Sequence, residues 1–476
     1  MSEAKGAGRM GAGVSRWTMA HFAGAVASLV AAEVLMASGA AFPGADLGAP
    51  LTLIAVHLVT IGWLGLLVFG ALYQFVPVLV AKPLFSQRLA LVSLVLVGLG
   101  LAGMIVGFAA LSGGGALVHA LGLGGLLVVS GFAVAIVNLA ATLVRGRPLA
   151  MPARFVAAGL GCLALTGLLG LAFACAIAAP PWAPSRASQW LSAILARGLT
   201  AHVTLGLGGW FTLVAMGVSY RLLSMFMLAP EAKARFAPWV LGAALLGLAA
   251  VFVGVFVAPE AAATGGGLEE GGFVLLGLAV ALYVADVVTL YRARVRRNIE
   301  LNAKASAVAV ALLGLATVAF AAAHAFGADD PAITGAVALL FAFGWLSGLA
   351  LAQLFKIVPF LTWLERFAPK IGKGPQPRVQ DLVDERRAAP WYVGYFAAVL
   401  TAAGATAVEA PTVAQAALAV QAVATVLIAG EFLRARRSDG TTRKPEPPRT
   451  VVPFPKPRTA KPQTEGDPHG HRTAHS

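Results

Sequence analysis

Residues 51–80 read LTLIAVHLVTIGWLGLLVFGALYQFVPVLV, a stretch without a single Asp, Glu, Lys or Arg. An α-helix needs about 20 predominantly apolar residues to cross the hydrocarbon core of a bilayer. The stretch exceeds that length and lacks the alternation of polar and apolar residues that is typical of membrane β-strands. It therefore predicts a long transmembrane helix.

The whole chain shares this apolar character. Of its 476 residues, 59% are hydrophobic and only 12% are charged, and the mean hydropathy is +0.82. Soluble globular proteins carry about twice that share of charged residues, roughly a quarter of the chain. The composition therefore excludes a water-soluble enzyme. Because lipid cannot satisfy free backbone N–H and C=O groups, the spanning elements are expected to be helices.

Further apolar stretches follow along the chain, and together they predict an all-α polytopic membrane protein of twelve transmembrane helices. The predicted spans, numbered 1 to 12 below, are 18–40, 51–80, 88–111, 116–143, 155–179, 195–227, 237–258, 271–291, 305–327, 332–363, 390–408 and 412–433. They form a membrane domain at 18–433. A short N-terminal tail at 1–17 precedes it, and a tail at 438–476, rich in Pro, Lys and Arg, is expected to be disordered.

The basic residues predict the orientation of the helices. The 35 Lys and Arg residues lie in the two tails or around the loops after even-numbered spans, except for Arg186, Arg197, Arg221 and Lys356. Because such residues are enriched in cytoplasmic loops, we expect both termini in the cytoplasm of a bacterial-type inner membrane. The net charge of +14 is then a topology signal and not a nucleic-acid surface. The expected partner is the lipid bilayer, with a redox partner or other membrane subunits as further candidates.

One pattern recurs in spans 2, 6 and 10. A Gly-Trp pair is followed by a small residue seven positions after Trp, an aromatic residue ten positions after Trp, and Pro or Ser four positions further. The members are Gly62, Trp63, Gly70, Tyr73 and Pro77; Gly209, Trp210, Gly217, Tyr220 and Ser224; and Gly344, Trp345, Ala352, Phe355 and Pro359. The ends of spans 4, 8 and 12 also correspond. The period is four helices, which predicts three units at about 18–145, 155–297 and 305–433 in a pseudo-three-fold arrangement.

Three units of four helices, with both termini cytoplasmic, resemble subunit I of the heme-copper oxidases and the related NnrS-type membrane proteins. A transporter of the major facilitator kind would repeat after six helices instead. The resemblance covers all twelve spans and rests on topology, the repeat and a few residues. It implies that spans 2, 6 and 10 form the inner lining, and that heme is the cofactor, with copper as the other candidate.

Four histidines lie near the predicted outer ends of their spans, namely His57, His119, His202 and His324, whereas His21 is predicted to be interfacial. A single histidine in a helical bundle most often packs or donates a hydrogen bond, but four in one layer favour a ligand site. Neutral imidazole is a common ligand of heme iron and of copper. The oxidases carry a heme ligand on span 2 and a copper ligand on span 6. The resemblance therefore implies that His57 is an axial heme ligand.

By the same resemblance, His202 is a ligand of heme or copper. His119 and His324 are further candidates, although the oxidases place no ligand on those helices. Arg197, five residues before His202, would pair with a heme propionate or simply mark the membrane surface. The sequence departs from the oxidases on spans 7 and 10, which contain no His, and an oxygen-reducing binuclear centre is therefore not expected.

Charged residues inside the spans form a second group of candidates. Gln74, Arg221 and Lys356 occupy equivalent positions toward the inner third of spans 2, 6 and 10. The two cations would bind an anion or a lipid phosphate, or would extend to the inner headgroups. Glu33 and Asp286 are intramembrane acids, which are candidates for a proton path or for an ion pair.

Three hypotheses follow. The first is a membrane-embedded heme- or copper-binding protein in electron transfer, nitric oxide handling or metal sensing, which would be a heme-dependent oxidoreductase if it is an enzyme. The second is a transporter of anions or small molecules that uses Arg221 and Lys356. The third is a structural or assembly protein without a cofactor. No phosphate loop or zinc-protease helix occurs in the sequence.

Overall fold

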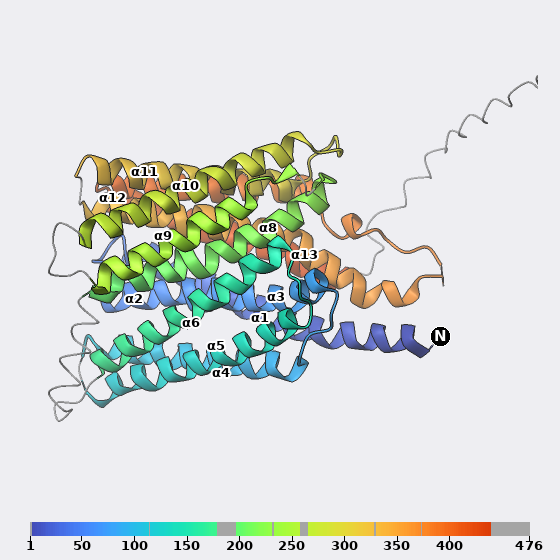
Figure 1. Ribbon diagram of the computed structural model, residues 1–476, viewed down its shortest axis with the longest axis horizontal. Coiled ribbons are helices and arrows are strands. Elements are labelled where there is room, and N and C mark those ends of the chain that lie inside the picture. The colour runs from blue at the N-terminus through green and yellow to red at the C-terminus, as the bar shows by residue number, and fades with distance from the viewer. Residues whose placement is uncertain are drawn as a thin grey trace, which may run out of the picture.

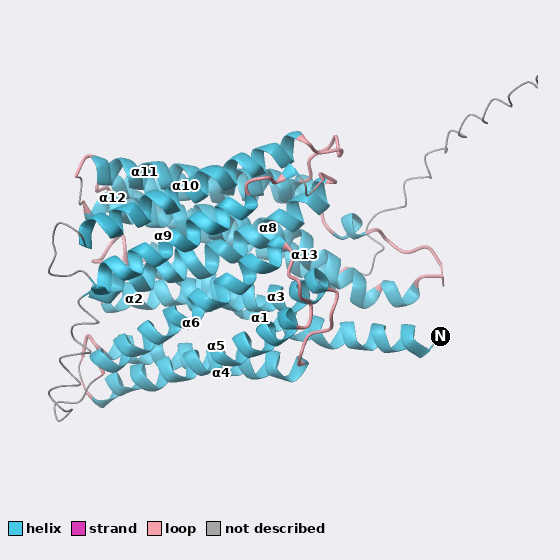
Figure 2. Ribbon diagram, viewed as in Figure 1, coloured by secondary structure: helices cyan, strands magenta, loops and turns pink. Residues whose placement is uncertain are grey.

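The computed structural model describes residues 2–113, 115–178, 197–230, 233–257, 265–327, 330–372 and 374–438. In these ranges the regular structure is helical and contains no strand (Figure 2). Eleven helices within them are long and apolar enough to cross a membrane. The chain is thus an all-α polytopic membrane protein, and the long helices run side by side (Figure 1).

The helices of the first unit follow the predicted spans. They are α1 (Ser2–Ala37); α2 (Pro50–His57), η1 (Leu58–Gly65) and α3 (Leu66–Val80), which together form span 2; α4 (Gln87–Ala110); and η2 (Ala116–His119) with α5 (Ala120–Val144). The predicted N-terminal tail is helical from Ser2 on, and the part of α1 that is compatible with a membrane begins at Arg16.

The second and third units repeat this order. The second consists of α6 (Met151–Ile177), the span Arg197–Met227 with η3 (Thr204–Phe211) and α8 (Thr212–Met227), α9 (Ala237–Val257) and α10 (Gly265–Arg292). The third consists of α11 (Leu301–Ala325), α12 (Pro331–Leu339) with η5 (Leu340–Ser347) and α13 (Gly348–Arg366), the short turns η6 (Ala368–Lys370) and η7 (Val379–Leu382), α14 (Glu385–Ala407) and α15 (Pro411–Arg437). Helix α14, the predicted span 11, is not among the eleven, so the count of twelve stays a prediction. The predicted C-terminal tail lies outside the described residues apart from Ser438.

The packing of the helices has the four-helix period of the sequence. In each unit the third and fourth helices form an intimate pair, namely α4 with α5, α9 with α10 and α14 with α15. The first helix packs on the second, as α1 on α3, α6 on α8 and α11 on α13. Helix α15 then packs against α1, which closes the three units into a ring.

Each inner helix contains one eight-residue π-helical segment, and each segment includes the repeated Gly-Trp pair. Trp63, Trp210 and Trp345 are at most 1% exposed and are the largest fully buried side chains. Each reaches a neighbouring unit: Trp63 Nε1 donates to Ser347 Oγ (2.8 Å), and Trp210 and Trp345 pack on aromatic rings of the unit before theirs. The repeated tryptophans therefore join the units at the centre of the bundle.

A polar side chain on the fourth helix of each unit holds the start of the third helix. Asn138 accepts from Ser86 N at the start of α4 (2.9 Å). Asp286 accepts from Phe236 N just before α9 (3.1 Å) and from the hydroxyl of Tyr220 (3.0 Å). The sequence alone did not indicate that Tyr220 and Phe236 are the hydrogen-bond partners of Asp286.

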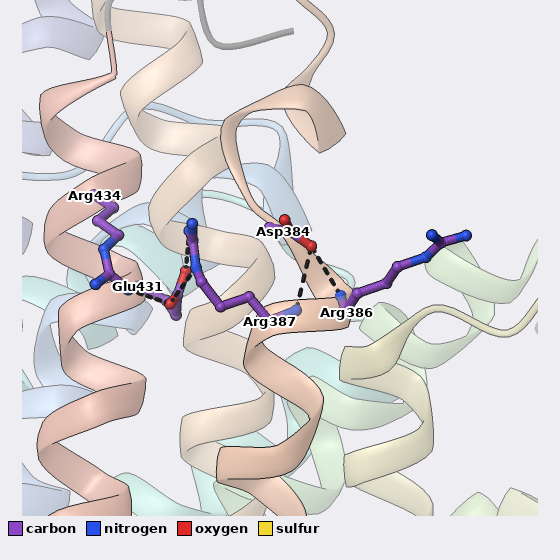
Figure 3. A network of polar contacts seen from close by, with 5 residues as sticks. All are labelled: Asp384, Arg386, Arg387, Glu431 and Arg434. Carbon is purple, nitrogen blue, oxygen red and sulfur yellow. Dashed lines mark hydrogen bonds and ion pairs between the residues drawn. The ribbon is translucent and has the colours of Figure 1, made fainter.

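Glu431 on α15 plays this part in the third unit. It accepts from Arg387 Nε (2.8 Å) and Nη2 (2.6 Å) in the first turn of α14, and Arg434 donates to it as well (Figure 3). Asp384 caps the same helix by accepting from the backbone N–H of Arg386 and Arg387. The side chain of Arg386 points away from Glu431.

The N-terminus lies at the same end of the bundle as the segments that join α10 to α11 and α13 to α14 (Figure 1). These two segments carry basic residues that predicted the orientation, among them Arg294, Arg296, Lys370 and Arg378. The N-terminus and these basic segments therefore lie together at one end of the bundle.

Candidate functional site

A cavity of about 390 Å³ lies where the first unit meets the second, lined by α2, η1, α4, α5, α6 and residues 199–211. Its lining consists of hydrophobic side chains and glycine apart from His57, Thr60, Thr166 and His202. Three lining residues, Val56, Leu199 and Val203, are 44–60% exposed at the surface of the bundle. The cavity therefore reaches the apolar surface of the helical bundle.

His57 is the last residue of α2 and directly precedes η1. Its Nδ1 lies 2.7 Å from the carbonyl oxygen of Leu53, one turn earlier. The ring packs against Phe108 on α4, with the ring centroids 4.8 Å apart. The backbone of its own helix and one aromatic neighbour therefore set the orientation of this imidazole.

His202 is held in the same way by a different helix. Its Nδ1 lies 3.1 Å from the carbonyl oxygen of Thr166 on α6, and its ring packs edge-on against Phe173 at 5.3 Å. Gly170 leaves room for the ring, since a Cβ built on it would lie 3.0 Å from His202 Cε1. The missing side chain at Gly170 thus lets α6 pack closely against the His202 ring.

The two hydrogen bonds define the chemistry of the rings. A carbonyl oxygen only accepts, so each Nδ1 carries the proton and each Nε2 keeps its lone pair. Protein imidazoles that bind metals commonly have this arrangement, in which a carbonyl fixes the tautomer and orients the ring. Both rings line the same cavity. The cavity therefore offers two neutral nitrogen ligands from different units.

The other predicted ligands lie elsewhere. His119 ends η2, and its Nδ1 bonds the carbonyl oxygen of Ala178 (3.0 Å) beyond the end of α6. His324 is exposed on α11 and stacks on Phe320 (5.9 Å between centroids, 14° between planes). Arg197 is exposed at the start of its span and is not part of the cavity lining. Of the four histidines in the predicted layer, the fold brings together only His57 and His202.

His21, which the sequence predicts to be interfacial, is fully buried between neighbouring helices. It lies against Gly70 of α3, where a Cβ would come within 2.8 Å of the Cβ of His21, and its ring meets Tyr73 edge-on at 5.6 Å. The close approach at Gly70 draws α1 against α3, and this covers the ring.

The donor set discriminates between a bare metal ion and heme. In the described part of the chain no group of three or more His, Cys, Asp or Glu side chains could hold a metal ion. Structural and catalytic zinc sites use three or four such ligands, whereas heme iron is already held by its porphyrin and takes one or two further protein ligands. The hydroxyl oxygen of Thr166 is buried without a hydrogen-bond partner in the cavity wall. Two imidazoles in an apolar cavity are therefore a donor set that is compatible with heme.

Two of the three repeated polar positions, Gln74 and Lys356, tie an inner helix to the start of its unit, and the third, Arg221, is half-buried on α8. Gln74 Nε2 donates to Thr18 Oγ1 on α1 (3.1 Å). Lys356 Nζ pairs with Glu300 Oε2 (2.6 Å), the residue that precedes α11, and Arg296 pairs with the same carboxylate. Because Glu300 neutralises Lys356, that cation is engaged within the protein and does not favour an anion site.

Comparison with protein-family models and with curated proteins finds no match to this chain. The relation to the heme-copper oxidases therefore stays a prediction.

Proposed function

We propose that the chain is a membrane-embedded heme protein in which His57 and His202 are the iron ligands. One observation carries the proposal: two neutral imidazoles from different units line the same apolar cavity, each with its Nδ1 occupied by a backbone carbonyl and its Nε2 left as a ligand. Because the cavity reaches the apolar surface of the bundle, the cofactor would reach it through the bilayer.

Bound heme would supply one-electron exchange, and iron held by both imidazoles would have no free position for a gas molecule. The protein's part is to hold the two imidazoles in one tautomer and to exclude water by the apolar lining. Electron transfer is therefore the class of activity that these features support. An oxygen-reducing centre with a second metal is not proposed, because the site has no third ligand among the described residues.

Absorption spectroscopy tests the proposal. The purified full-length chain, titrated with hemin, is expected to develop a Soret band, and His57→Ala and His202→Ala are each expected to weaken heme binding by about tenfold or more. His324→Ala is the matched control, because that ring lies on α11 outside the cavity. The proposal is overturned if the folded wild-type chain binds no hemin, or if the two cavity variants bind it as well as the control does.

A further inference from the structure

A second polar site lies where α15 closes the ring against α1. Glu33 on α1 and Gln421 and Thr425 on α15 are each 0% exposed. Gln421 Nε2 donates to Glu33 Oε1 (2.7 Å), and Thr425 Oγ1 donates to the same oxygen (3.0 Å). The site is separate from the histidine cavity, and nothing about it depends on the heme proposal.

Two oxygens at this site are buried without a hydrogen-bond partner, Glu33 Oε2 and Gln421 Oε1. An ionised carboxylate bears charge on both oxygens, and leaving one of them without a donor inside a membrane protein is very costly. Here both donors converge on Oε1. This is the asymmetry of a neutral carboxylic acid, whose carbonyl oxygen accepts while its hydroxyl oxygen donates.

In the part of the chain that the structure describes, Glu33 has no cationic partner. Among the ion pairs of the described residues none includes it, whereas Glu431, on the same α15, is paired with two arginines. Tyr395 on α14 is the other titratable group close to Glu33, and its hydroxyl donates to the carbonyl oxygen of Phe343 (2.9 Å). The surroundings of Glu33 therefore stabilise its neutral form.

We propose that Glu33 is an intramembrane proton-binding site, in which the bound proton on Oε2 is donated to Gln421 Oε1. The carboxyl and the amide then form a cyclic pair with two hydrogen bonds, one in each direction. A single proton thereby satisfies both unpartnered oxygens. Proton uptake converts the carboxylate to a carboxylic acid, forms one O–H bond, and joins the first and last helices of the ring.

Infrared spectroscopy of the full-length chain in lipid at neutral pH tests this proposal. The wild type is expected to show the C=O band of a protonated, hydrogen-bonded carboxylic acid, which shifts in D₂O and is lost in Glu33→Gln. Asp286→Asn is the control and should keep the band, because the oxygens of Asp286 accept from Tyr220 and from backbone N–H groups. If Glu33→Gln keeps the band, or if the wild type has none, the proposal is overturned.

If Glu33→Gln does not fold, a variant that keeps Glu33 and changes its hydrogen-bond donor, Thr425→Val, tests the same proposal. In Thr425→Val the acid loses a donor to its carbonyl oxygen, so the band is expected to move to higher frequency. Thr425→Ser keeps the donor and should restore the wild-type position. A band that is the same in all three proteins would show that the acid is not Glu33.

Discussion

At the scale of single residues, the candidate site depends on which nitrogen of each histidine is free. His57 is fixed by the carbonyl of Leu53 on its own helix, whereas His202 is fixed by Thr166 on the neighbouring α6. The tautomer of His202 therefore depends on how closely α6 approaches, and Gly170 sets that approach. A substitution at Gly170 should consequently alter heme binding, although Gly170 is not one of the two proposed iron-binding residues.

Gly170→Ala is expected to weaken heme binding by about tenfold, in the range found for residues that orient a metal ligand. The physical reason is the new Cβ, which would lie 3.0 Å from His202 Cε1 and displace the imidazole. Hemin titration of the purified variant measures the effect. Gly161→Ala on the same helix meets open space and serves as the control, and equal affinities of the two variants would contradict the expectation.

At the scale of helices, the fourth helix of each unit positions the third through one polar side chain. Asn138 and Asp286 do so by accepting from backbone N–H groups, whereas Glu431 does so through its ion pair with Arg387 on α14. The Glu431 side chain is 1% exposed, and that of Arg387 is 46% exposed. Replacing Arg387 therefore removes a cationic partner from the buried carboxylate of Glu431. Breaking one side of a buried ion pair in this way destabilises the folded protein.

Arg387→Ala is expected to lower the free energy of unfolding by about 2 kcal/mol, less than for a fully buried pair because Arg387 is partly exposed. Unfolding in mixed detergent, followed by circular dichroism, measures the change. Arg386→Ala should stay within about 0.5 kcal/mol of the wild type, since that side chain points away from Glu431 (Figure 3). Equal losses in the two variants would show that the ion pair with Glu431 does not stabilise α14.

At the scale of the whole molecule, three units close into a ring, and the described residues form a histidine cavity at the junction of the first two. The cavity forms between the first and second units, because His57 and His202 stand before the tryptophans of spans 2 and 6. Span 10 has the same π-helical segment and no histidine. All three inner helices therefore share the π-helical Gly-Trp segment, whereas His57 and His202 occur only on spans 2 and 6.

The orientation of the ring is tested by cysteine labelling. In a chain whose free cysteines, Cys162 and Cys175, are replaced by Ala, Ser112→Cys should react with an impermeant maleimide in intact cells. Arg294→Cys should react only after the membrane is opened, because Lys- and Arg-rich segments stay in the cytoplasm. The opposite result would reverse the predicted topology.

Much of the fold follows from local sequence. Runs such as 51–80 must be helical, because a backbone in lipid has to satisfy its own hydrogen bonds. The Gly-Trp repeat predicted the four-helix period, and the packing has that period. The π-helical form of the repeated segments was not predicted, since no local pattern of apolar residues separates an α-helix from a π-helix.

The amino-acid sequence by itself determined an all-helical membrane protein, because hydrophobicity and charge act residue by residue along each span. It also predicted that four histidines lie in one layer. Only the tertiary structure decided that His57 and His202 share a cavity, that His21 is buried, and that Glu33 meets Gln421 across 388 positions of sequence. The physical reason is that these contacts depend on how the helices rotate and pack. The sequence of one helix does not state which of its faces meets a neighbour.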